Sequence, residues 1–187
     1  SLYSLNSSNS PNSSPFQLVL LGAVTLLSWS CATPPEVPRQ VTFKESDFAR
    51  ASGTGSGVVA GQAFTVLTDK SVRYGKDVWL LLLPVNAYTT ESIQRKYIAG
   101  ENLADGPPQY QKHLRIVQAD DQGNFAFRHI PPGDYYVGTM IDCSYSFLNT
   151  DGTKATVNRS QYIYATVSVQ NGQTVTVTEW SQAYTER

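Results

Sequence analysis

The sequence predicts an all-β fold, a Greek-key β-sandwich of about seven strands, for the larger C-terminal part of the chain. Charged residues make up only 16% of the 187 residues, whereas Gly, Pro, Tyr, Ser and Thr are abundant. That composition favours strands and turns over helices. Short apolar or alternating segments also recur along the chain, and each ends in a turn signal.

Three segments are expected before this domain. Residues 1–15 are rich in Ser, Asn and Pro, which predicts disorder because too little apolar surface can be buried. Residues 16–31 form a signal-like segment, whose apolar run of about 14 residues is shorter than the roughly 20 that span a bilayer. Residues 32–56 form a linker that its prolines are expected to stiffen. The domain is expected over residues 57–187.

The apolar run ends in Ser30-Cys31-Ala32, an arrangement that resembles the lipobox of bacterial lipoproteins. In that family the cysteine is diacylated and becomes the new N-terminus after cleavage. Ser28 stands where an aliphatic residue is usual, and Trp29 stands where a small residue is usual. The resemblance implies lipidation of Cys31 and a membrane anchor in the bacterial cell envelope. Because no aspartate follows the cysteine, the outer membrane is the expected destination, facing the periplasm or the cell surface.

The alternative is that the apolar run is a buried strand or helix and that Cys31 is an ordinary cysteine. The run lies between a polar tail and a proline-rich linker. That position favours the signal segment.

The first predicted strands lie in residues 57–67 and 78–84. The second is the continuous apolar run Val-Trp-Leu-Leu-Leu-Leu-Pro, which predicts a central strand covered on both faces and ended by Pro84. Residues 69–71 and 74–77 are predicted turns between the two strands.

Residues 114–141 carry the most informative strand and turn pattern. A hairpin turn there contains Gly123, which supplies a positive φ, and a Pro-Pro-Gly-Asp turn follows. The predicted strands are residues 114–119, 125–127 and 135–141, and the turns are residues 120–124 and 131–134. The side chains expected in the core are Phe125, Phe127, Tyr135 and Val137.

The last two predicted strands are residues 162–169 and 174–178, which alternate apolar and polar side chains. Asn171-Gly172 lies between them, and Asn-Gly is a strong signal for a tight β-hairpin. We therefore expect these strands to pair with each other.

Two motifs together resemble the carboxypeptidase regulatory-like domain, a transthyretin-like β-sandwich. They are D-x-G-x-F-x-F at residues 121–127 and I-P-P-G-x-Y at residues 130–135. The resemblance extends over residues 57–177, and the segment 86–113 departs from it as an insertion. Members of that family are non-catalytic modules, so the resemblance implies a binding or scaffolding role.

The insertion is where a specific function could reside. Residues 89–98 have a Thr start and apolar residues at a helical offset, which predicts a short helix. Tyr88, Tyr97 and Tyr110 are candidates for a surface that contacts a protein or a carbohydrate. The alternative is an insertion that only covers an edge of the sheet.

A catalytic role is not expected, and no catalytic residue is assigned. The two histidines, His113 and His129, lie in no metal-binding or nucleophile-activating motif. The transthyretin-like fold includes hydroxyisourate hydrolase, but this chain lacks both the C-terminal signature and the early histidines of that family. The alternative function is a hydrolase of that type acting on a small molecule, with His113 or His129 in a cleft. We expect both histidines at the rim, apart and exposed.

Other partners are not expected from the composition. The formal net charge is -1, which argues against nucleic acid. Cysteines at C-x-x-C spacing are absent, so no metal or cofactor is predicted, and Cys143 is expected to be an inert core thiol. The pair Asp120-Asp121 could supply oxygen ligands to calcium, but a short hairpin turn is the favoured interpretation.

Overall fold

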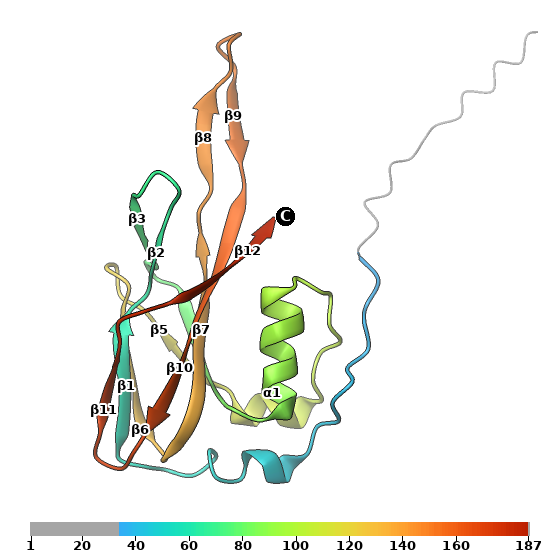
Figure 1. Cartoon of the computed structure of the whole chain (residues 1–187), viewed down its shortest axis with the longest axis vertical. Coiled ribbons are helices and arrows are strands. Elements are labelled where there is room, and N and C mark those ends of the chain that lie inside the picture. Colours follow the sequence, from blue (N-terminus) through green and yellow to red (C-terminus); the bar gives the residue numbers. More distant parts are fainter. Residues whose placement is uncertain (1–33, 187) are drawn as a thin grey trace, which may run out of the picture. The chain divides into compact units, whose positions relative to one another are not determined.

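The computed structural model describes residues 34–186, and these form a β-sandwich with a helical layer on one side. The smaller sheet has the order β11-β1-β6, and the larger sheet has the order β12-β10-β7-β4-β5 (Figure 1). This architecture confirms the predicted all-β sandwich. The strands of the smaller sheet are β1 (Gly57–Gln62), β6 (Asn124–Ile130) and β11 (Thr174–Val177). Those of the larger sheet are β4 (Trp79–Pro84), β5 (Arg115–Gln118), β7 (Gly133–Asp142), β10 (Arg159–Val169) and β12 (Ser181–Glu186).

The core lies between the two sheets. All four side chains predicted to supply it are buried there, and Phe127 is only 2% exposed. Alternate residues of β4 and β7 reach the same core, because successive side chains of a strand point to opposite faces of the sheet. Gly123 has φ +84° in the predicted hairpin turn, which is the conformation that a glycine tolerates.

The predicted pairing of the last two strands is wrong. β10 pairs with β7 and β12, whereas β11 pairs in parallel with β1 in the other sheet. The tight turn does form, since the Gln173 amide donates to the Gln170 carbonyl at 3.2 Å. Through this turn the chain crosses from the larger sheet to the smaller sheet. Val169 and Val177 therefore bury their side chains in the core from opposite sides.

Two small hairpins extend from one end of the sandwich (Figure 1). One consists of β2 (Phe64–Val66) and β3 (Val72–Tyr74), and the other of β8 (Tyr145–Leu148) and β9 (Lys154–Val157). All side chains of β8 are exposed. This second hairpin therefore adds a projecting arm and little to the core.

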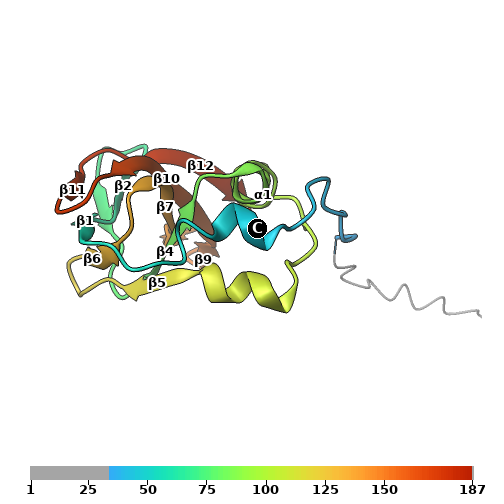
Figure 2. The same cartoon turned by 90° about the horizontal axis from the view of Figure 1, so that it is seen from below.

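The insertion covers the outer face of the larger sheet, and not an edge. It contains α1 (Ala87–Glu91), a π-helical continuation (Ser92–Ile98) and a 3-10 helix (Pro108–His113). The predicted helix exists but starts earlier, because Asn86 caps it: the Asn86 side chain accepts from the Thr89 amide, and the Thr89 hydroxyl accepts from the Asn86 amide. Figure 2 shows the smaller sheet, the larger sheet and the helices as successive layers.

A second apolar cluster joins this helical layer to the larger sheet. It contains Leu83, Ile93, Tyr162 and Ala183, all buried. Burial of these side chains gives the insertion a fixed place on the sheet.

Residues 34–56 are packed against the domain, which differs from the free linker expected for this segment. Phe48 is completely buried, in a 3-10 helix (Glu45–Phe48). Val37 exchanges backbone hydrogen bonds with Asn102 and Ala104 at 2.8 and 2.9 Å. Proline stiffness favoured an extended chain, but the insertion offers these residues hydrogen-bond partners and apolar surface. The compact unit accordingly begins at Pro34.

Glu91 fixes this segment to the insertion. Its carboxylate accepts hydrogen bonds from the backbone amides of Gln40 at 2.6 Å and Val41 at 3.3 Å, and it forms an ion pair with Arg95 at 3.0 Å. Burial acts to raise the pKa of Glu91, but these hydrogen bonds and nearby Arg39 together hold it below its usual value. We call residues 34–41, held in this way, the strap.

Candidate functional site

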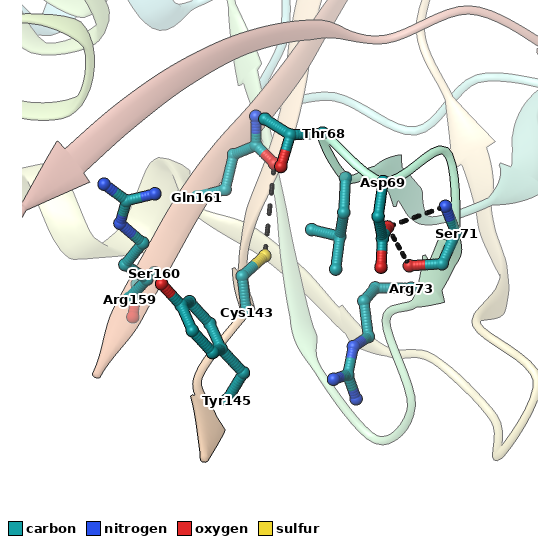
Figure 3. A pocket seen from close by; sticks show the side chains of 10 residues that line it. Thr68, Asp69, Ser71, Arg73, Cys143, Tyr145, Arg159, Ser160 and Gln161 are labelled. Carbon is teal, nitrogen blue, oxygen red and sulfur yellow. Dashed lines mark hydrogen bonds between the residues drawn. The ribbon is translucent and has the colours of Figure 1, made fainter. Parts of the chain in front are cut away.

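A cavity lies at the end of the sandwich where the two hairpins project. It has a volume of about 310 Å³ and is bordered by the β2–β3 hairpin, the junction of β7 with β8 and the start of β10 (Figure 3). Its lining residues are Leu67, Thr68, Asp69, Ser71, Arg73, Cys143, Tyr145, Arg159, Ser160 and Gln161.

The deepest polar group of this cavity is the amide of Gln161, which is 1% exposed. Its oxygen accepts a hydrogen bond from the Thr65 hydroxyl, and its nitrogen donates to Gln182 at 3.0 Å. Cys143 lies beside it as a free, buried thiol whose pKa is raised by burial. Its place in the buried cluster confirms the expected core thiol, and a raised pKa favours the protonated form, which is the less reactive one.

Charged and aromatic groups surround the mouth of the cavity. Asp69 accepts hydrogen bonds from the Ser71 hydroxyl at 2.6 Å and the Ser71 amide at 2.9 Å, and these lower the pKa of its carboxyl group. In Figure 3, Asp69 and Arg73 face the cavity from one side, and Tyr145 and Arg159 lie on the other. Tyr145 is 48% exposed, so its ring is available to a ligand. The site therefore offers hydrogen-bond donors, a carboxylate acceptor and an aromatic face.

The sequence did not predict this cavity. Its residues come from three segments of the chain: the pairing of β7 with β10 brings two of them together, and the hydrogen bond from Thr65 to Gln161 holds the β2–β3 hairpin beside them. The turn at residues 69–71 was predicted, but a turn signal carries no information about a ligand.

The three tyrosines of the predicted aromatic surface do not share one surface. Tyr88 is 1% exposed and packs against Phe43, Phe48 and Tyr110, with the Arg39 guanidinium 4.3 Å from its ring centroid. Tyr88 is therefore a core residue, because the strap and the insertion close over it. Tyr97 and Tyr110 both line a second cavity of about 200 Å³ between the insertion and the larger sheet.

The expectation for the histidines holds for His129, which is exposed, but is wrong for His113. The His113 ring stacks on Phe48 with centroids 4.7 Å apart, and its Nδ1 lies 2.7 Å from the Ser52 hydroxyl oxygen. Its Nε2 lies 3.5 Å from the Glu45 carboxylate. Because Phe48 is buried, the His113 ring that stacks on it is covered by the packed N-terminal segment.

Ser52, His113 and Glu45 resemble a catalytic triad in residue type, but their hydrogen bonds do not suit one. The Ser52 hydroxyl donates its proton to the Phe48 carbonyl at 2.9 Å. His113 Nδ1 must then be the donor to Ser52, whereas a general base must accept the proton of the nucleophile. We interpret this contact as structural.

Metal binding has no support in the described part of the chain, where no group of three or more His, Cys, Asp or Glu side chains is placed to hold an ion. Asp120 uses its carboxylate to accept hydrogen bonds from Gln122 and Asn124 within the hairpin turn. This confirms the turn interpretation. No helix within residues 34–186 is long and apolar enough to cross a membrane, and Cys31 lies outside the described residues.

The protein is thus a β-sandwich with one cavity at its end and another under its insertion. No family model matches the chain, and no curated protein matches it either. A solved structure from Pseudomonas aeruginosa, that of a "putative carbohydrate binding protein", has a similar fold, with a TM-score of 0.58. It is 23% identical in sequence, and the match covers 73% of this chain and 97% of that one. At this identity the likeness concerns the fold alone.

Proposed function

We propose that this protein is a non-catalytic binding module of the bacterial cell envelope, anchored through a lipidated Cys31, and that its ligand is a carbohydrate. The resemblance to carboxypeptidase regulatory-like domains supports a non-catalytic role. The hydrolase alternative has no such support, because the Ser52 hydroxyl donates to the Phe48 carbonyl and His113 is buried beside it.

The cavity at the end of the sandwich is the observation on which the carbohydrate proposal rests. Its volume of about 310 Å³ lies at the lower end of the range of about 300–1,000 Å³ typical of small-ligand sites. A sugar ring presents an apolar face of C–H groups and a rim of hydroxyls. The exposed face of Tyr145 suits the first, and the charged groups of Asp69 and Arg73 suit the second.

The structural neighbour adds a second reason to test carbohydrates before other ligands. A carbohydrate is the ligand suggested for that protein, which has a similar fold. A protein partner is the other outcome to be tested.

A glycan array probed with the full-length chain in detergent, followed by titration of the glycans that bind, tests the ligand. We expect Tyr145→Ala and Arg73→Ala each to weaken binding by about tenfold or more, the effect of losing one good contact. Lys154→Ala is a matched control, because Lys154 is exposed on β9 and does not line the cavity. Failure to bind any glycan, or unchanged binding by both cavity variants, would contradict the proposal.

The anchor is tested separately by Cys31→Ala. The wild-type chain is expected in the membrane fraction, with mass spectrometry showing an acylated Cys31 at the mature N-terminus. The variant is expected to lose acylation and to remain unprocessed. An intact N-terminal run on the wild-type protein would refute lipidation.

A further inference from the structure

The second cavity has features of a ligand site in its own right. It has a volume of about 200 Å³ and lies between the insertion and the outer face of the larger sheet. Leu81 and Leu83 of β4 line it from the sheet, and Tyr97 and Tyr110 line it from the insertion. Arg39, Lys96 and Asp105 add charged groups to this lining.

The aromatic walls of this cavity are held in place before any ligand arrives. The Tyr97 ring stacks on Tyr162 with centroids 4.6 Å apart and an interplanar angle of 15°. Tyr110 packs edge-on against the buried ring of Tyr88 at 5.1 Å. A preformed wall reduces the conformational entropy that a ligand must overcome on binding.

Hydrogen-bonding groups of the cavity are still available. The hydroxyls of Tyr97 and Tyr110 form no hydrogen bond with another described residue, and burial raises the pKa of Tyr110, so its phenol stays neutral and can donate. Lys96 and Asp105 form an ion pair at 2.9 Å, which offers a further donor and a further acceptor side by side.

The charges around the cavity compensate each other. Lys96 is paired with Asp105, and Arg39 lies 3.8 Å from Glu91 while donating to Ser92 and to the Ala104 carbonyl. A ligand with a net charge would leave one of these pairs unbalanced. The geometry therefore favours a neutral molecule that has an apolar ring face and several hydroxyls.

We infer that the tyrosine-lined cavity under the insertion is a second carbohydrate site, which binds a neutral sugar ring independently of the cavity at the end of the sandwich. This inference rests on the proposed function for the class of ligand. It goes beyond it in assigning two sites to one chain.

Strand β10 separates the two sites. Gln161 lines the first cavity, and the next residue, Tyr162, supports Tyr97 in the wall of the second. These two side chains point to opposite faces of the larger sheet, and the two cavities share no lining residue. One monosaccharide cannot reach both, and the chain is expected to bind two.

The test is an NMR titration of the ¹⁵N-labelled full-length chain in detergent with neutral monosaccharides: glucose, galactose, mannose and N-acetylglucosamine. We expect a sugar to shift two separate sets of amides, one around residues 68–73 and one around residues 93–114. Tyr97→Ala should abolish the saturable shifts of the second set alone, and Tyr145→Ala those of the first set alone. Tyr97→Phe, which keeps the stacked ring and removes the hydroxyl, should weaken the second site several-fold without loss of folding.

Any other result of the titration would overturn one or both of the site assignments. A single set of shifts that Tyr145→Ala removes would overturn the second site and leave the proposed function standing. A single set that Tyr97→Ala removes would support the tyrosine-lined site and contradict the assignment of the first cavity. No saturable shift with any sugar would overturn both proposals. The melting temperature and NMR spectrum of each variant distinguish loss of a site from loss of the fold.

Discussion

Phe127 packs in the core edge-on to Phe125, with ring centroids 6.0 Å apart. Phe127→Ala removes a buried aromatic ring and leaves a cavity, which is expected to lower the free energy of unfolding by about 3–5 kcal/mol. Chemical denaturation of both proteins measures this difference. Phe147→Ala on the projecting arm is the matched control, and because Phe147 is 45% exposed and lies outside the core, the change should stay within about 0.5 kcal/mol.

The ionisation of Glu91 makes the stability that the strap contributes depend on pH. Its pKa is lower in the folded state than in the unfolded state, so its stabilising contribution is present above the ordinary carboxyl pKa and is lost as the pH falls through the lowered value. Glu91→Gln should therefore destabilise the protein at pH 7, by about 1–3 kcal/mol for the loss of charged hydrogen bonds. The difference between variant and wild type should shrink below pH 4 or so, the usual carboxyl range. An equal difference in free energy of unfolding at pH 7 and at pH 3 would contradict this account.

At the scale of elements, the β8–β9 arm is expected to be dispensable for folding. Its two strands pair only with each other, and most of their side chains are exposed or half-buried. Replacing residues 147–155 by a short Asn-Gly turn should leave the β circular dichroism spectrum unchanged and shift the melting temperature by only a few degrees. A large loss of stability would mean that the arm packs on the sandwich.

The sequence predicted those elements whose pattern is local. β6 and β7 carry alternating core residues next to clear turns, and β5 leads into the hairpin turn before β6; all three were predicted. β8 and β9 were not predicted: each is only four residues long and contributes no buried side chain, so its short alternation stands out little from the surrounding loop. The pairing of β11 with β1 was also missed, since partner choice between sheets depends on the whole core and not on the turn before the strand.

The same reasoning explains what could be predicted of the sites. The insertion was identified as a place for ligand contacts, and Tyr97 and Tyr110 do line a cavity there. Tyr88 was misjudged because its burial depends on Phe43 and Phe48, which lie in a segment expected to be a linker. The first cavity requires three segments of the chain to meet, which no local pattern indicates.

At the scale of the whole molecule, the strap should make the compact unit longer than the family-like domain. Limited proteolysis of the full-length chain is expected to leave a resistant fragment that begins near Pro34, because the strap and Phe48 are held by hydrogen bonds and burial. Mass spectrometry of the fragment locates its start. A resistant fragment that begins near Gly57 would show that residues 34–56 detach readily from the sandwich.

For a chain anchored at Cys31 as proposed, the docked strap would limit how far the domain can move from the membrane. With residues 34–56 free, such an anchor would allow the two cavities to search a large volume. The strap fixes the chain from Pro34 onward, and the three Cα–Cα steps from Cys31 to Pro34 span at most about 11 Å. An acylated chain would therefore hold the domain close to the bilayer surface. The greatest distance from the bilayer at which it could contact a ligand would be set by the size of the sandwich and its arm.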